Sequence, residues 1–249
     1  EPRVFPAQAA GAKGLERTTM ALDDEPATHA ASKTVVLQEA VVDGVQDPEL
    51  VERRREQICE AALELFLEKG FASTTIRDIC ARSGVNQGSI YDYVANKNDI
   101  LRRLLNKLWF RPDVPSLVER LDRNPDAPLQ EHLAAFFRDA WTIKRKGTIL
   151  AYRSVPYLQK EDRRTMRARD RALIDELAAR LRKLTGLPED DQRAEIVANL
   201  IGFLAAFAPM RDWLTREIDA ELMLQTVAAG VAAMVEQLAE EAVQPPRAG

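Results

Sequence analysis

Apolar residues recur at helical spacing from Val51 onward, with polar residues filling the positions between them. The first such stretch ends at Gly70, a residue suited to close a helix in a left-handed conformation. Its apolar face comprises Ile58, Ala61, Ala62, Leu65 and Phe66. No stretch alternates convincingly between apolar and polar residues as a strand does. The pattern therefore predicts an all-α protein.

Further helices are predicted along the rest of the chain, at Lys97–Leu108, Pro128–Arg145, Thr148–Leu158, Lys160–Leu184, Asp191–Phe207 and Asp219–Ala239. Pro112 and Pro115 interrupt the chain after the first of these, and Pro156 kinks the third. The last two helices are the most apolar. They are suited either to the core of a monomer or to a subunit interface.

Two short helices are predicted between Gly70 and Lys97. Thr75 and Asp78 form a capping-box-like start to the first, in which the threonine hydroxyl accepts from the backbone N–H of Asp78. A turn follows at Ser83-Gly84, and Asn86 is placed to cap the second helix. Two short helices joined by a tight glycine-containing turn fit the helix-turn-helix template.

The chain is accordingly divided into four parts. Residues 1–50 show no sustained helical period and are expected to form a disordered extension, although Val35–Val45 is apolar enough for one short element. Residues 51–97 are predicted to form a three-helix DNA-binding domain. Residues 98–241 are predicted to form a helical ligand-binding and dimerisation domain, and 242–249 a tail.

The charge distribution supports nucleic-acid binding although the net charge is −4. Residues 51–111 hold eleven Lys and Arg against eight Asp and Glu, whereas the segments on either side are both net negative. A local basic surface matters more than total charge, because salt screens phosphate attraction beyond ~8–10 Å.

No enzyme motif is visible: the chain has no phosphate-cradling glycine loop, zinc-protease motif, paired Cys-x-x-Cys or nucleophile elbow. We therefore expect no enzyme, no cofactor and no metal. Cys59 and Cys80 are interpreted as reduced core residues and His132 as a packed side chain, with a redox switch and a ligand contact as the respective alternatives.

A recognition helix exposes small or polar side chains at its first turn, so that it can enter the major groove. The candidate residues here are Asn86, Gln87, Gly88 and Ser89. A polar turn that merely faces solvent would look the same. Tyr91 and Tyr93 are candidate phosphate contacts through their hydroxyl groups, and Lys97 is another because it lies at a helix start. Arg54 belongs to a basic run that is expected to precede the first helix and could reach the DNA backbone or a minor groove. For each of these residues, packing or simple solvation is the alternative.

These features together resemble the TetR family of bacterial transcriptional repressors. The resemblance is specific over about Arg54–Leu101, through Ala61–Phe66, Gly70-Phe71, Thr75–Ile79, Gly84-Val85, Ile90-Tyr91 and Asn96-Lys97. It implies a nine-helix homodimer that pairs through its last two helices. It also implies DNA contacts by Thr75, Gln87, Gly88, Ser89, Tyr91 and Lys97. The chain departs from the family pattern at Asp92, an acid near the DNA face, and at Val94, where the family usually has an aromatic residue.

The central stretch, with Ala151–Arg153, Tyr157-Leu158, Glu161–Arg164 and Trp213, resembles the branch of this family that senses acyl-CoA thioesters. The predicted pocket has an apolar part and a basic part that would attract a phosphorylated handle. Its predicted lining is Phe136, Phe137, Trp141, Tyr152, Phe203, Phe207 and Met210, with Arg145, Lys146 and Arg153 as the basic groups. An ordinary aromatic core with basic surface residues is the alternative.

The expected function is that of a cytoplasmic, homodimeric repressor that binds a palindromic double-stranded operator and is released by a small molecule, best an acyl- or aryl-CoA thioester. A drug-responsive efflux regulator is the alternative within the family, but the sequence shows no convincing pocket carboxylate for a cationic drug. A non-sequence-specific architectural DNA-binding protein is the alternative outside it. No membrane partner is expected.

Overall fold

The computed structural model describes residues 36–42, 45 and 47–243, and these form helices and loops without any strand. The α-helices are α1 (Pro48–Lys69), α2 (Ile76–Ser83), α3 (Lys97–Leu108), α4 (Leu117–Arg123), α5 (Leu129–Trp141), α6 (Arg145–Ser154), α7 (Lys160–Thr185), α8 (Gln192–Leu204), α9 (Phe207–Thr215) and α10 (Ala220–Val243). Two short 3-10 helices, η1 (Ile90–Asp92) and η2 (Val155–Tyr157), complete the set. The all-α prediction is confirmed.

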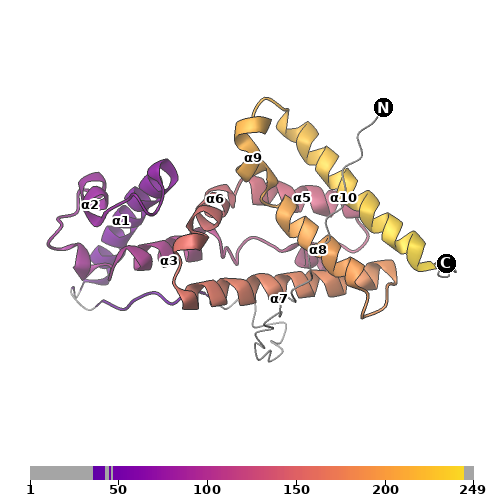
Figure 1. Cartoon of the computed structure of the whole chain (residues 1–249), viewed down its shortest axis with the longest axis horizontal. Helices are drawn as coiled ribbons and strands as arrows, with labels where there is room; N and C mark the ends of the chain where they lie inside the picture. The colour runs from indigo at the N-terminus through magenta and orange to yellow at the C-terminus, as the bar shows by residue number, and fades with distance from the viewer. Residues whose placement is uncertain (1–35, 43–44, 46, 244–249) are drawn as a thin grey trace, which may run out of the picture.

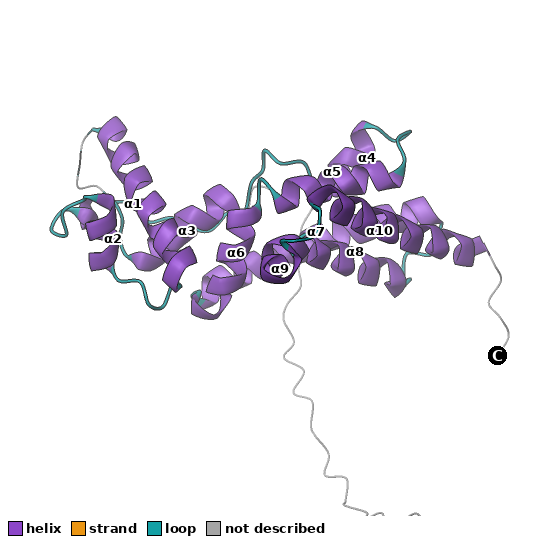
Figure 2. Cartoon of the chain, turned by 90° about the horizontal axis from the view of Figure 1, so that it is seen from above, coloured by secondary structure: helices purple, strands orange, loops and turns teal. Residues whose placement is uncertain are grey.

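The molecule is elongated, with α1–α3 at one end and α5, α8 and α10 at the other (Figure 1). The long helix α7 runs along the body between them, and the view from above shows the same order (Figure 2). Two clusters of buried apolar side chains match these two ends, one around α1–α3 and one around α5, α7, α8 and α10.

Several element boundaries differ from the predicted ones. Helix α5 ends at Trp141 instead of Arg145, and α6 begins at Arg145 instead of Thr148. The expected second helix of the helix-turn-helix is only the 3-10 turn η1, preceded by a hydrogen-bonded turn. Helix α4 was not predicted, although Ser116 and Glu119 form a full capping box at its start. The predicted helix Asp191–Phe207 ends at Leu204, and α9 follows at an angle of 52° to α8.

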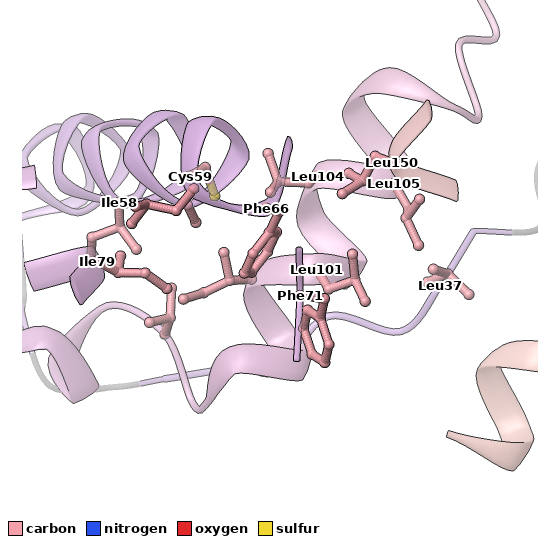
Figure 3. Close-up of a cluster of buried hydrophobic side chains, with 14 of the residues drawn as sticks. Leu37, Ile58, Cys59, Phe66, Phe71, Ile79, Leu101, Leu104, Leu105 and Leu150 are labelled. Atoms are coloured by element: carbon pink, nitrogen blue, oxygen red, sulfur yellow. The ribbon is translucent and has the colours of Figure 1, made fainter. Parts of the chain in front are cut away.

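The core around α1–α3, the predicted DNA-binding end, includes residues from well beyond residue 97. Ile58, Phe66 and Ile79 pack with Leu101 and Leu105 of α3 (Figure 3). The same cluster includes Leu150 and Ala151 of α6 and Met166 of α7. Helix α6 therefore packs with α1–α3, whereas α7 takes part in both clusters, since Leu177, Ala178 and Leu181 lie in the other one.

Helix α6 crosses the end of α3 at backbone contact distance. A Cβ atom placed on Gly147 would lie 2.2 Å from the carbonyl oxygen of Leu108 and 2.9 Å from the backbone nitrogen of Trp109. Real Cβ atoms do not approach backbone so closely, so only glycine permits this crossing. The consequence is a close junction between α3, which leads out of the predicted DNA-binding end, and the helical body.

Residues 36–42 form a strap docked on α3, so the expectation of a disordered extension up to residue 50 does not hold for this part; residues 1–35 lie outside the described range. Leu37 is 1% exposed, on the side of the cluster that holds Leu105 and Leu150 (Figure 3). Asn106 clamps the Leu37 backbone from both sides: Leu37 N donates to its Oδ1 (2.9 Å), and its Nδ2 donates to Leu37 O (2.9 Å).

Further along the strap, the backbone of Ala40 is held in the same way. Its N–H donates to Asp99 Oδ1 (2.8 Å), and Arg103 Nη2 donates to its carbonyl oxygen (2.7 Å). Arg103 also pairs with Glu39 at 2.7 Å. One side of α3 therefore provides hydrogen-bond partners for the backbone groups of this irregular segment, through Asp99, Arg103 and Asn106.

The clamp by Asn106 is expected to contribute measurably to stability. Asn106→Ala leaves the backbone groups of a buried residue without partners and should lower the free energy of unfolding by about 1–3 kcal/mol. The control is Lys107→Ala, a substitution on the same helix as Asn106. It removes the exposed ion pair between Lys107 and Glu56 of α1 and should lower the free energy of unfolding by at most ~1 kcal/mol. Urea denaturation measures both, and equal losses would contradict a structural role for the strap.

Candidate DNA-binding surface and effector cavity

The start of α2 is built as the sequence predicts. Thr75 is the N-cap residue: Asp78 N donates to its Oγ1 (3.1 Å), and its own N–H donates to Asp78 Oδ2 (2.8 Å). Lys69 pairs with the same carboxylate at 2.7 Å. The hydrogen bonds from Lys69 and Thr75 hold the pKa of Asp78 well below its usual range. Thr75 itself is exposed, at a helix start whose backbone N–H groups favour anions.

The predicted recognition residues form an exposed polar tip. Gly88 N donates to Asn86 Oδ1 (2.8 Å), and Ser89 Oγ donates to Asn86 O (3.2 Å), which fixes a tight turn. Asn86, Gln87 and Gly88 are exposed, while Ile90 directly behind them is fully buried. The tip is therefore anchored by this turn and by the core behind it, while the Gln87 side chain is exposed and can meet a partner.

The two tyrosines after the tip differ. Tyr91 is 51% exposed and remains a candidate phosphate contact, whereas Tyr93 is buried and packs in the core. Val94 is fully buried, so the position where the family usually has an aromatic residue is filled by a smaller apolar one. Asp92 is half-buried beside the tip.

Lys97 is held by backbone groups. Its Nζ donates to Phe71 O (2.8 Å) and Thr74 O (2.7 Å) and lies 4.4 Å from the centre of the Phe71 ring. Burial lowers the pKa of its ammonium. This geometry makes Lys97 a tie between the start of α3 and the loop before Thr75. The predicted phosphate contact of Lys97 stays a prediction.

The basic run Arg53–Arg55 lies within α1 rather than before it, because Asp47 caps that helix and Pro48 begins it. Arg54 Nη1 donates to Gln57 Oε1 (3.0 Å), and Arg55 Nε donates to Tyr93 O (2.8 Å). Arg77, which the sequence analysis did not select, is exposed in the first turn of α2 beside Thr75. The sequence signal for Arg77 as a candidate DNA contact is its position two residues after Thr75, the N-cap residue of α2.

A cavity of about 410 Å³ lies in the body just beyond the end of α3. This size falls in the range of small-molecule pockets, ~300–1,000 Å³. Residues of α5, α6, α7 and α8 and the segment 109–118 line it. Its walls are largely apolar, with aromatic residues Trp109, Phe110, Phe136, Tyr152 and Phe203.

One side of the cavity carries charge. Arg169 is buried; its Nη2 donates to Phe110 O (3.0 Å), and its guanidinium carbon lies 4.1 Å from the centre of the Phe110 ring. The neighbouring Asp170 also lines the cavity, and burial raises the pKa of its carboxyl to about 6 against the opposing effects of Arg169 and Lys144. Burial, and then Asp170, raises the pKa of Tyr152.

Only some of the predicted ligand residues face this cavity. Phe136, Tyr152 and Phe203 line it, whereas Phe137 and Trp141 lie in the core beside it. The remaining five, which are not among its lining residues, are Arg145, Lys146, Arg153, Phe207 and Met210.

Two of the three predicted basic groups, Arg145 and Arg153, are engaged elsewhere. Arg145 pairs with Asp212 at 2.9 Å, and Arg153 Nη1 donates to Leu67 O of α1 at 2.8 Å. Sequence reasoning missed Arg169 and Asp170 because they sit in a charged helix that reads as solvated. It also found no pocket carboxylate, whereas Asp170 and Glu176 both line the cavity.

The outer face of α8 and α10 is apolar and uncovered in the single chain. Ile196, Leu200 and Phe203 of α8 and Leu222 of α10 are exposed. On α10 the small residues Ala229, Gly230 and Ala233 continue this face. Among the described helices, α10 alone is by itself long and apolar enough to cross a membrane by length and composition.

Both cysteines are buried in the DNA-binding core, as predicted. Burial raises the pKa of the Cys59 thiol to about 12 and raises that of Cys80 as well, so neither is readily converted to the reactive thiolate. His132 is also buried, with Nε2 2.9 Å from Asn124 O, which confirms its interpretation as a packed side chain.

Comparison with known proteins identifies the DNA-binding part directly. Residues 58–104 match the model of the bacterial regulatory proteins of the tetR family. The HTH-type transcriptional regulator HbdR of Aromatoleum sp. (strain CIB) is 36% identical over 132 residues, which are 51% of this chain and 56% of that protein. The chain thus spans little more than half the length of this relative.

A second relative is matched over more of its length. The HTH-type transcriptional regulator BetI 1 of Chromohalobacter salexigens is 31% identical over 165 residues, which are 63% of this chain and 80% of that protein. A tetR-family regulatory protein from Rhodococcus RHA1 has the same fold, with a TM-score of 0.58 at 18% identity over 74% of this chain and 97% of that one. The chain belongs to the TetR family of bacterial transcriptional regulators, which are DNA-binding proteins and not enzymes.

Proposed function

We propose that the chain is a homodimeric repressor that binds a palindromic operator through the tip Asn86–Ser89 and releases it when a small molecule fills the cavity. The observation that carries this proposal is the double attachment of α6. Thr148 and Tyr152 of this helix line the cavity, while Leu150 and Arg153 contact the DNA-binding end.

DNA binding is supported by the shape and polarity of the tip. Gln87 presents an amide that can bond the edge of a base, and Gly88 leaves room for close approach. Thr75, Arg77 and Tyr91 are exposed around the tip as candidate phosphate contacts. Arg54 is half-buried in α1 and is a weaker candidate.

Dimerisation through α8 and α10 is supported by the apolar face they leave uncovered. Large exposed apolar patches on soluble proteins mark interfaces, and the small residues on α10 allow close helix approach. A two-fold axis through this face would pair two DNA-binding ends on the same operator. The dimer would act in the cytoplasm, where bacterial DNA is found.

Two helices connect the cavity to the DNA-binding end. Helix α3 begins at Lys97, tied to the loop before Thr75, and is followed by the cavity residues Trp109 and Phe110. Helix α6 lies across it at Gly147. Helix α3 is also joined to α7, because Arg102 Nε donates to Asp162 Oδ1 at 2.9 Å and both side chains are largely buried. An occupant that displaces α6 or α3 would therefore shift the tip.

The effector best supported by the walls is a small, mostly apolar molecule, either free or as the acyl or aryl group of a CoA thioester. Arg145 and Arg153 do not line the cavity, so a phosphorylated handle would have to use Arg111 or Lys144 instead. Asp170 and Glu176 favour the alternative of a cationic drug, because they supply the carboxylates that such a ligand needs.

Sequence-specific binding separates a repressor from an architectural protein. DNA selected from a random pool should yield a palindrome with half-sites about one helical turn apart or slightly more. Gel shifts should show binding at least ~10³-fold tighter than to random DNA. Equal affinity for the palindrome and random DNA would favour the architectural alternative.

Gln87 and Lys97 should differ in effect. Gln87→Ala should cost ~1–3 kcal/mol on the selected palindrome and relax preference at one base pair, with the melting temperature unchanged. Lys97→Met removes the tie to Phe71 and Thr74 but keeps the apolar stem. It should weaken all DNA sequences alike and lower the melting temperature. Calorimetry measures the melting temperatures of the two variants, and gel shifts measure their DNA affinities. If Lys97→Met leaves the melting temperature unchanged and only reduces the salt dependence of DNA binding, Lys97 is a phosphate contact instead.

Effector release is tested by titrating ligands into the protein–operator complex. A panel of CoA thioesters, the matching free acids and cationic drugs should contain members that lower operator affinity. By linkage, operator should lower the affinity for the same ligands by an equal factor. Release by free acids or drugs alone would remove the thioester assignment, and no release by any class would contradict ligand control.

A further inference from the structure

Asp170 is the carboxylate at the charged side of the effector cavity, and its surroundings are unusual for an ionised group. Asp170 is solvent-exposed and lines the cavity, although the protein around it still partly desolvates its carboxyl. The groups that influence it are Arg169 beside it on α7, Lys144 before α6, and Tyr152 on α6. Burial outweighs the two cations, so that its pKa is raised to about 6.

The neighbouring cation is committed to another contact. Arg169 donates to Phe110 O and stacks on the Phe110 ring, which holds its guanidinium on the wall formed by the segment after α3. Leu173 and Ile174, on the next turn of α7, are apolar parts of the cavity lining. Filling the cavity would therefore remove part of the water that hydrates Asp170.

An apolar occupant would displace that water. A carboxylate that loses its water without gaining a hydrogen bond is strongly destabilised, whereas a donor on the ligand restores the lost interaction. Hydrogen bonds to an ionised acceptor in a low-dielectric site are the strong ones. A second carboxylate in the same place would instead add like-charge repulsion.

We propose that Asp170 determines effector specificity by selecting apolar molecules that present a hydrogen-bond donor, such as an aromatic hydroxyl or an amine, at the end that reaches α7. The inference rests on the proposed role of the cavity as an effector site. It narrows that role, because a purely apolar acyl tail or a free acid would leave Asp170 unsatisfied or repelled.

The test uses four probes of similar size that share a butylphenyl group. They are 4-butylphenol, 4-butylbenzylamine, 4-butylanisole and 4-butylbenzoate, titrated into the full chain by calorimetry without DNA. The phenol and the amine each carry a donor, the anisole has it capped by a methyl group, and the benzoate is an anion. The two donors should bind at least about ten-fold more tightly than the anisole and the benzoate, since a charge-assisted hydrogen bond forms only with them.

Two variants assign the preference to Asp170. Asp170→Leu removes the acceptor and should bring the affinities for the phenol and the anisole to within about two-fold of each other. Asp170→Asn keeps the shape of the side chain but not its charge. It should lower the affinity for the amine most, because the ammonium group of that probe loses its charged partner. The control is Asp175→Asn on the same helix, whose carboxylate pairs with Arg171 and is not among the cavity-lining residues; it should leave all four affinities unchanged.

Several outcomes would overturn the inference: anisole or benzoate binding as tightly as the phenol, a preference that survives in Asp170→Leu, or no binding by either donor probe. Because these measurements contain no DNA, they are independent of whether the chain is a repressor. Loss of operator specificity in gel shifts would contradict the proposed function while leaving the Asp170 result standing.

Discussion

The structure depends on the crossing of α3 and α6 at Gly147. No side chain fits there, since a Cβ would lie 2.2 Å from Leu108 O, so the backbones of the two helices are in direct contact. Closely packed interiors have discrete arrangements rather than continuous ones, which is why a small displacement at such a contact moves whole elements. The crossing places Leu150 in the core of the DNA-binding end and Tyr152 on the cavity. One ten-residue helix therefore belongs to both parts of the molecule.

The contacts around this crossing stiffen it from several directions. The strap at residues 36–42 is clipped to α3 by Asn106 and Arg103, and Arg102 of the same helix is joined to Asp162 of α7. At the far end of α3, Lys97 ties the helix to the loop before Thr75. Because the same helix is fixed at its start, middle and end, the tip that would meet DNA is held by elements outside the helix-turn-helix itself.

Local signals made much of the DNA-binding end predictable. The capping box of Thr75 and Asp78, the buried face of α1 and the turn at Gly84 each depend on residues close in sequence. The short η1 was mistaken for a longer helix because Asn86 looks like a cap, whereas its side chain closes a turn with Gly88. Cavity residues depend on how distant helices are rotated against each other. For this reason Phe136 was found while Arg169 and Asp170, in a charged helix, were missed, and Arg153 was assigned to the cavity although it reaches α1. The apolar run Val35–Val45 indicated one short element, but not its docking on α3, because that depends on residues far away in sequence.

The central claim is that α6 carries the connection between the cavity and the DNA-binding end. Hydrogen–deuterium exchange of the full chain, measured with and without the operator palindrome, tests it without knowledge of the effector. The account predicts that DNA changes the protection of α6, including the amides around Thr148 and Tyr152, as well as that of α1–α3. A change confined to residues 58–97, with α6 exchanging identically in both states, would contradict it.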